Sequence, residues 1–332
     1  MEIISSAPGR CGIVGNPTDM YGGSVLSLSV RERATCRLMM RQSKGINATN
    51  EDDHAIFTNK SDLILCGDKL DILRAALTFF ALDLEAVTLN IHLSTDIPMK
   101  AGMAGSTAML ASIVGAFDAL LGLKMSPYAL AETTRKIEAR VMGVVCGHQD
   151  QHMAIFGGLN FMDFAGKESL TQSEEEPFAT VEPLGAFFPN PPFILAHTGK
   201  QHHSGTVHRS PRERWLAGEP LFRNSYLRIA ELARHGKRAL LQNNLQLLGE
   251  LMNENHALVR ELGGSGEEND RLIGAALDAG AYGAKLAGAG GGGTIIALTD
   301  NLTHVGDALT KAGSPRLLYP SPVEGLRVTQ SD

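Results

Sequence analysis

The chain has 332 residues, of which 43% are hydrophobic and 20% charged, so it is expected to fold as a globular protein. Its formal net charge of −6 and the lack of any basic run argue against a nucleic-acid partner. No apolar segment reaches the ~18 residues of a membrane span. Because residues 1–8 lack a secretion signal and the four cysteines lie far apart, we expect a cytoplasmic protein with reduced thiols.

The first third of the chain is predicted to be rich in strands. Residues 24–30 alternate strictly between apolar and polar side chains, which is the period-two pattern of a half-buried strand. Residues 68–82 instead carry leucines and a phenylalanine near helical spacing, which predicts an amphipathic helix. The elements expected here are strands at 3–5, 11–14, 24–30 and 35–40, the last two paired, a polar loop over 41–62, the helix at 68–82 and a strand at 87–93.

A glycine-bearing loop follows the strand at 87–93 and leads into an apolar helix over 107–121. Gly102 and Gly105 allow backbone angles and close ligand approach that a side chain would prevent. A loop of this kind leaves backbone N–H groups free at a helix N-terminus, where they favour an anion such as phosphate. An ordinary strand-to-helix turn is the alternative for this stretch taken alone.

The composition changes over residues 166–192, where acidic and proline-rich stretches predict a surface loop and a hinge. We therefore divide the chain into an N-terminal domain, residues 1–190, and a C-terminal domain, residues 191–332. The other expected elements are a helix with Ser126 as N-cap and Pro127 at its first position that ends near Gly143, strands at 159–164, 193–197 and 294–298, and helices at 223–234, 237–261 and 268–279.

Three glycine-bearing segments, residues 7–23, 98–108 and 288–293, form an ordered set along the chain. This set resembles the GHMP kinases, the superfamily of galactokinase, homoserine kinase, mevalonate kinase and phosphomevalonate kinase. Residues 147–161 look like the heptose 7-phosphate kinases of its sugar-1-kinase branch, and residues 15–19 look like the glucuronokinases. The resemblance implies an α+β protein of two domains, the first like ribosomal protein S5 domain 2 and the second ferredoxin-like.

The resemblance also implies an activity, the ATP-dependent phosphorylation of a sugar or sugar-derivative hydroxyl, in particular the anomeric one. ATP and Mg²⁺ would be the cofactors. A heptose 7-phosphate, a uronic acid and a plain hexose all stay open as the acceptor, and a homo-oligomer stays open as the assembly. The alternatives are a non-catalytic sugar and nucleotide sensor on the same fold and a decarboxylase acting on a phosphorylated mevalonate relative.

Four residues are expected to carry the chemistry. Asp150 matches the family's general base, and Arg10, which follows Ala-Pro-Gly, would stabilise developing charge. Glu138 and Ser106, rather than Thr107, match the family's Mg²⁺ ligands, and oxygen donors of this kind suit the ion. A surface turn for Asp150 and a solvated helix position for Glu138 are the alternatives.

The expected binding residues form two sets. The nucleotide loop departs from the family pattern at Ala104 and Gly105, where glycine and serine are usual. Turn formation by Asp19 and a basic surface loop around residue 202 are the alternatives for the acceptor set. The nucleotide set is Pro98, Lys100, Ala101, Gly102, Met103, Ala104, Gly105, Ser106 and Thr107. The acceptor set is Asp19, Gly22, Gly23, Gly147, Lys200, His202, Arg209 and Gly290.

Overall fold

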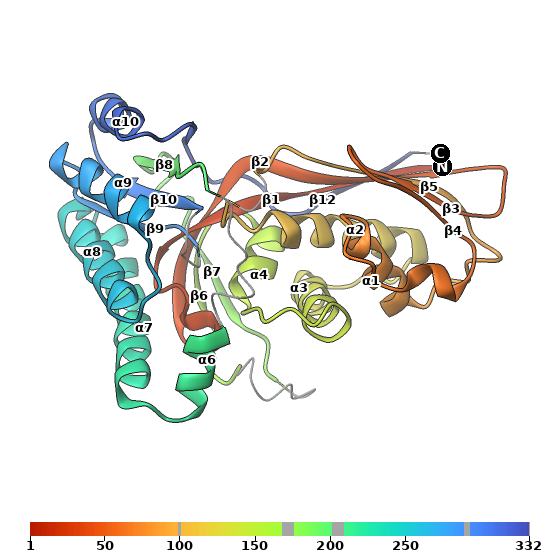
Figure 1. Ribbon diagram of the computed structural model, residues 1–332, viewed down its shortest axis with the longest axis horizontal. Coiled ribbons are helices and arrows are strands. Elements are labelled where there is room, and N and C mark those ends of the chain that lie inside the picture. Colours follow the sequence, from red (N-terminus) through yellow and green to blue (C-terminus); the bar gives the residue numbers. More distant parts are fainter. Residues whose placement is uncertain (99–100, 168–175, 201–208, 289–292, 332) are drawn as a thin grey trace.

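Two β-sheets with helices packed on them make up the computed structural model, which describes residues 1–98, 101–167, 176–200, 209–288 and 293–331 (Figure 1). The strands are β1 (Glu2–Val14), β2 (Ser24–Met40), β3 (Gly45–Thr49), β4 (His54–Phe57), β5 (Thr88–Thr95), β6 (Leu159–Asp163), β7 (Thr180–Pro183), β8 (Phe193–His197), β9 (Gly283–Leu286), β10 (Thr294–Leu298), β11 (Leu317–Leu318) and β12 (Arg327–Ser331). The α-helices are α1 (Asp71–Phe80), α2 (Gly105–Leu121), α3 (Pro127–Lys136), α4 (Gln149–Phe156), α6 (Arg209–Leu216), α7 (Pro220–Leu241), α8 (Leu245–Glu261), α9 (Glu267–Asp278) and α10 (Leu302–Lys311).

The larger sheet has eight strands in the order β12-β1-β2-β5-β3-β4, with β6 and β7 added on β2. All of its pairs are antiparallel except β3 with β5. Helix α2 packs on β1 and β2, and α1, α3 and α4 gather beside it under the sheet (Figure 1). The main hydrophobic core lies between these helices and the sheet.

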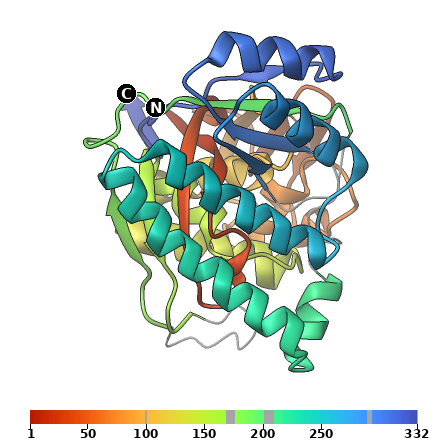
Figure 2. The same cartoon turned by 90° about the vertical axis from the view of Figure 1, so that its left-hand side faces the viewer.

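The smaller sheet has four strands in the order β11-β8-β10-β9, all antiparallel. Helix α8 packs on β9 of this sheet and lies beside α7, which packs on β1 and β2 of the larger sheet (Figure 2). Helix α9 contacts β9 and β10, and α10 contacts β8. The strands of the two sheets separate between residues 183 and 193, and the last strand, β12, returns to pair with β1. The division at residues 190 and 191 stays a prediction.

Several predicted elements agree with the structure. The helix at 68–82 corresponds to α1, the strand at 87–93 to β5, and the helix at 107–121 to α2. Ser126 is the N-cap of α3, since its side chain accepts a hydrogen bond from the Ala129 N–H, and Pro127 is the first helical residue. Local signals of capping and periodicity were sufficient for these elements.

Four predictions of local structure were wrong. Residues 3–5 and 11–14 are not separate strands but parts of one strand, β1. Residues 24–30 and 35–40 are not two paired strands but parts of one strand, β2, which pairs with β1 along its length. The predicted loop over 41–62 contains β3 and β4, whose polar residues lie near the sheet edge. The predicted break after residue 234 is absent, because α7 continues to Leu241. In each case long-range packing overrides the local polarity of the sequence.

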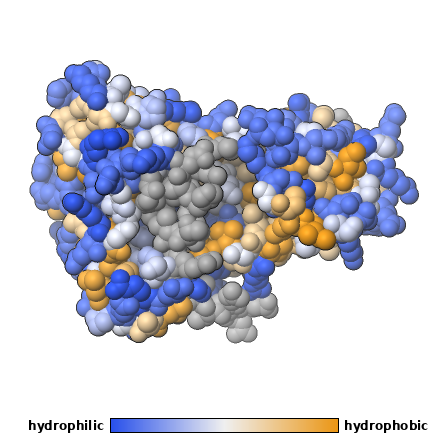
Figure 3. All heavy atoms as spheres, viewed as in Figure 1, coloured by the Kyte–Doolittle hydropathy of each residue, from blue (hydrophilic) through white to orange (hydrophobic). Residues whose placement is uncertain are grey.

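No helix of the described residues is long and apolar enough to cross a membrane. The face in Figure 3 is mostly hydrophilic, with hydrophobic atoms gathered over the region of α1. The fold places three segments around one cavity, namely the end of β1, the N-terminus of α2 and the N-terminus of α4.

Candidate active site

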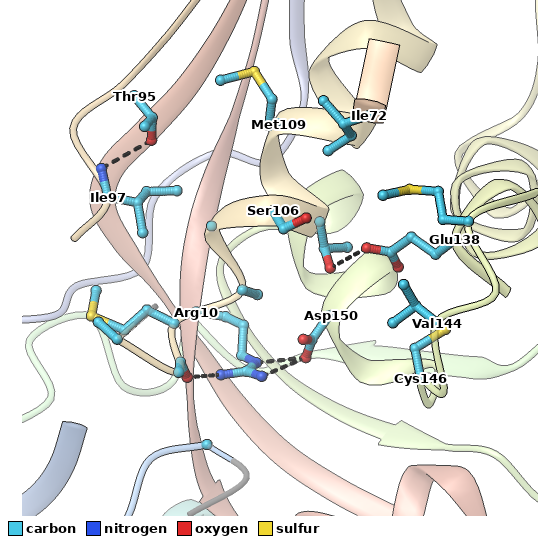
Figure 4. A pocket seen from close by; sticks show the side chains of 18 of the residues that line it. Arg10, Ile72, Thr95, Ile97, Ser106, Met109, Glu138, Val144, Cys146 and Asp150 are labelled. Carbon is cyan, nitrogen blue, oxygen red and sulfur yellow. Dashed lines mark hydrogen bonds and ion pairs between the residues drawn. The ribbon is translucent and has the colours of Figure 1, made fainter. Parts of the chain in front are cut away.

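A cavity of about 770 Å³ lies where these segments meet (Figure 4). Its lining includes Arg10 from β1, Asp19 from the turn after β1, residues 101–107, Glu138, and Asp150 from α4. These residues are far apart in the sequence, and only the tertiary fold brings them together. The cavity therefore unites the first two predicted glycine segments with the predicted catalytic residues, and Gly288 closes it from the third.

Asp150 and Arg10 form an ion pair that lines the cavity (Figure 4). Asp150 Oδ1 accepts hydrogen bonds from Arg10 Nε at 2.7 Å and is 2.6 Å from Nη2. Arg10 Nη1 donates to the carbonyl of Gly102 at 2.6 Å. The guanidinium is thus held between the second residue of α4 and the glycine loop. Because Asp150 keeps 31% of its side chain exposed, its carboxylate can reach a ligand in the cavity.

Asp19 is buried beside this pair and anchors the start of α4. Its Oδ2 accepts hydrogen bonds from the backbone N–H groups of His148 at 2.8 Å and Gln149 at 2.9 Å. Burial is the main cause that raises the pKa of Asp19, the Asp150 charge raises it further, and these backbone donors oppose both. Gly147 is required here, since a Cβ at that position would lie 1.9 Å from Asp19 Oδ2.

The glycine loop is wedged between two other segments. The backbone N–H of Arg10 donates to the Met103 carbonyl at 3.1 Å, and a Cβ on Gly288 would lie 2.4 Å from the Gly102 carbonyl oxygen. Gly102 has φ +71°, and Ala104, the N-cap of α2, has φ +59° with no side-chain cap. The first N–H groups of α2 therefore face the cavity without a capping side chain, as an anion site requires.

Glu138 lines the cavity near Asp150, on a single π-helical turn, η3 (Ile137–Val141) (Figure 4). Its Oε1 accepts a hydrogen bond from the Thr107 hydroxyl at 2.7 Å, and its Oε2 accepts one from Gln151 Nε2 at 2.5 Å. Burial, the largest cause, raises the pKa of Glu138 to about 7. The hydrogen-bond donors to Glu138 among the described residues are neutral, and a buried carboxylate with such donors is suited to receive a cation.

Ser106 and Thr107 differ in their surroundings. Thr107 is buried against Glu138, whereas Ser106 is exposed at the first turn of α2 and lines the cavity (Figure 4). The oxygen donors of Glu138, Ser106 and Thr107 match what Mg²⁺ accepts in proteins. The choice of Ser106 over Thr107 as the ligand stays a prediction.

The remaining predicted residues fall into three groups. Gly22, Gly23 and Pro98 do not line the cavity. Lys200 does not line it either and forms an ion pair with Glu268. The predictions for Lys100, His202, Gly290 and the side chain of Arg209 lie outside the described residues.

The sequence reasoning missed Lys285, which is 1% exposed on β9. Its Nζ donates to Asn16 Oδ1 at 2.7 Å and to the Leu286 carbonyl at 2.5 Å, and Asn16 Nδ2 in turn donates to the Gly288 carbonyl. Burial, the main cause, lowers the pKa of Lys285 to about 7, and the charge of Arg10 lowers it further. A lysine in an otherwise apolar strand next to a glycine loop was the signal that could have identified it.

Comparison with known proteins bears on the family and the fold of this chain. The family models described as GHMP kinases N terminal domain and GHMP kinases C terminal match residues 71–158 and 237–315. The mevalonate kinase of Thermococcus onnurineus is 27% identical, over 99% of both chains. The D-glycero-alpha-D-manno-heptose 7-phosphate kinase of Campylobacter jejuni is 26% identical, over 90% of this chain and 89% of that one. The Lactococcus lactis galactokinase structure superposes with a TM-score of 0.79 at 20% identity, covering 98% and 95%.

These matches and the shared architecture define a kinase. More particularly, the chain belongs to the GHMP kinase family, which confirms the resemblance seen in the sequence. The expected α+β fold is confirmed as well. The relatives include both mevalonate kinases and a heptose phosphate kinase at similar identity, so they leave the acceptor open.

Proposed function

We propose that this kinase transfers the γ-phosphoryl group of ATP to the anomeric hydroxyl of a sugar or sugar derivative. The Arg10–Asp150 pair carries the proposal, because it sets a carboxylate and a fixed cation beside the free N-terminus of α2. Phosphoryl transfer requires that arrangement: a base or positioning group for the attacking hydroxyl, and positive charge where negative charge develops.

Asp150 is the proposed general base. The acceptor O–H bond breaks as its proton passes to the Asp150 carboxylate, and the acceptor oxygen forms a bond to the γ-phosphorus. The bond to the bridging oxygen breaks, and ADP leaves with its electron pair. Arg10 stays protonated throughout, fixes Asp150 and stabilises the negative charge that builds up nearby.

The part of the cavity beside α2 and Glu138 is proposed to hold the phosphates and the metal. The N–H groups at the start of α2 would bind phosphate oxygens, and Glu138 with Ser106 would bind Mg²⁺. Mg²⁺ supplies charge neutralisation for the phosphates when it is bound. Ionisation of Glu138, whose pKa is about 7, is favoured by any such cation.

Asp19 favours a sugar as the acceptor. One oxygen of Asp19 accepts two backbone N–H groups, and the residue lines the cavity close enough to Asp150 for the second charge to raise its pKa. A sugar has vicinal hydroxyls, so one can donate to Asp150 while its neighbour donates to Asp19. Mevalonate, the acceptor named for several relatives, has no vicinal hydroxyl pair and carries a carboxylate.

The test is a panel of acceptors assayed for ADP release with Mg-ATP. It contains hexoses, heptose 7-phosphate, uronic acids and mevalonate, each with wild type and with Asp150→Asn. Turnover of a sugar that the variant loses supports the proposal. Turnover of mevalonate alone overturns the sugar assignment, and nucleotide binding without turnover of any acceptor indicates a sensor.

A further inference from the structure

A group of buried side chains lies on the face of α4 opposite Asp150. The proposed reaction does not use this group. His148 and His152 are four residues apart and so share one face of the helix, whereas Asp150 lies on the opposite face. Glu132 of α3 and Glu176 complete the group. One potential ligand atom from each of Glu132, His148 and Glu176 lies within 4.8 Å of the others.

The two histidines are buried with their nitrogens largely unpartnered. Both have 0% exposure. Neither ring nitrogen of His148 has a hydrogen-bond partner among the described residues, and the same holds for His152 Nε2 and Glu176 Oε1. An unpartnered buried polar atom costs about 1–3 kcal/mol. Several such atoms at one place indicate that a partner is bound there in the functional protein.

His152 is arranged as a metal ligand. Its Nδ1 lies 2.7 Å from the His148 carbonyl oxygen, and only a protonated Nδ1 can donate to that acceptor. Nε2 is therefore unprotonated and presents its lone pair. It lies 3.8 Å from Glu132 Oε1, which is also an acceptor. Lys167 Nζ lies 2.8 Å from that Glu132 oxygen, whereas no described residue donates to His152 Nε2. A histidine that donates its second N–H to a backbone carbonyl is the usual support of a metal-bound imidazole.

Aromatic packing holds both imidazoles in place. Phe164 stacks against His148 with ring centroids 5.6 Å apart and meets His152 edge-on at 5.3 Å. Imidazoles held in set orientations are ready to coordinate an ion.

Lys167 provides the alternative explanation for the carboxylates. Its Nζ is 2.8 Å from Glu132 Oε1 and 3.5 Å from Glu176 Oε2, and it donates to the Pro177 carbonyl at 3.0 Å. The lysine neutralises part of the acidic charge, but among the described residues the imidazole nitrogens of His148 and His152 Nε2 still have no partner. An ion-pair cluster therefore explains the two glutamates and not the two histidines.

We propose that Glu132, His148, His152 and Glu176 bind one transition-metal ion of the Zn²⁺ class. Two imidazole nitrogens and two carboxylate oxygens are a donor set that zinc accepts with tetrahedral geometry. The site is structural, because all four positions come from the protein and the side chains are shielded from solvent. The ion ties α3 and the segment at residue 176 to the start of α4, the helix that holds Asp19 and carries Asp150.

The experiment is a metal titration of the full chain in a Cys66→Ser background after treatment with a chelator. That background removes the other described group that could hold a metal, Cys66 with Asp68 and Asp71, which is exposed and paired with Arg74. Zn²⁺ is expected to bind with about one equivalent and to raise Tm by ~5 °C. Co²⁺ in its place is expected to give the strong visible absorption of a four-coordinate ion.

Three variants locate the site. His152→Phe keeps the ring shape and Glu176→Gln keeps the side-chain volume, and each is expected to weaken Zn²⁺ binding at least ~10-fold. The control, His235→Gln, removes an exposed histidine of α7 and is expected to bind like wild type. Wild-type protein that takes up no Zn²⁺ overturns the proposal, as does equal binding by all three variants. Because the wild-type titration stands alone, a variant that fails to fold does not remove the test.

Discussion

Asp150 lies against the guanidinium of Arg10, whereas Glu138, a second carboxylate of the same cavity, accepts hydrogen bonds from the Thr107 hydroxyl and the Gln151 amide. The first carboxylate is matched by a permanent cation and stays 31% exposed, whereas the second is buried and its pKa is raised to about 7. The Arg10–Asp150 pair is thus organised before any ligand binds. A cation bound beside Glu138 would neutralise the second carboxylate.

The largest effect is expected from a substitution of Asp150. Asp150→Asn keeps the size of the side chain and removes the proton acceptor, so turnover is expected to fall by about 10²–10⁴-fold. Nucleotide affinity, measured by calorimetry, is expected to stay within a few-fold of wild type, because α2 is unchanged. Near-normal ADP release from the variant would show that Asp150 is not the base.

Glu138→Gln tests the raised pKa of the second carboxylate. The folded-state pKa of Glu138 is raised from 4.5 to about 7, so the folded protein holds a proton that the unfolded chain has lost. The contribution of Glu138 to wild-type stability is therefore largest below pH 4.5, and it is lost as pH rises from 4.5 through 7. The variant lacks this fall, and its stability relative to wild type is expected to increase by at most ~3 kcal/mol between pH 4 and 8.

Chemical unfolding of both proteins in the presence of EDTA measures this difference. EDTA is included because a divalent ion would itself hold Glu138 in the charged form. A difference in unfolding free energy that does not change with pH would mean that Glu138 is ionised without a cation. The contrast between the Asp150 and Glu138 carboxylates would then be lost.

Gly147→Ala tests the packing that fixes Asp19 against the start of α4, the helix that carries Asp150. The added Cβ would lie 1.9 Å from Asp19 Oδ2, so the carboxylate must leave the N-terminus of α4. A loss of about 1–3 kcal/mol in unfolding free energy is expected, together with a higher KM for the acceptor. Gly274→Ala on α9 is the control, since nothing lies within 4 Å of its Cβ and alanine favours helices. Equal stability of the two variants would contradict the packing argument.

Ala104→Gly gives the smallest expected effect, and it acts on the loop beside Glu138. Ala104 has φ +59°, a left-handed conformation that glycine adopts without strain. Relief of that strain, partly offset by the greater freedom of glycine in the unfolded chain, is expected to stabilise the protein by ~0.5 kcal/mol. Urea unfolding measures it, and a destabilised variant would show that the alanine side chain makes a favourable contact here.

The sequence determined much of this protein by local means. Ser126 and Pro127 mark the start of α3, and the leucine spacing of 68–82 marks α1, because capping and periodicity depend on neighbouring residues. The glycine segments and the residues around Asp150 were enough to indicate the GHMP kinase family, since close approach of backbone to ligand requires glycine at fixed places.

Only the tertiary structure decided which side chains meet. Asp150 pairs with Arg10 across 140 residues, and Lys285 reaches Asn16 across 269. The mostly polar segment after Met40 contains β3 and β4 because β5 is available as a partner strand and Ile46, Ala48 and Phe57 are buried in the core. Such contacts depend on how distant segments pack, and the pKa of Glu138 depends on the burial that this packing creates. No local sequence pattern encodes these contacts or the pKa of Glu138.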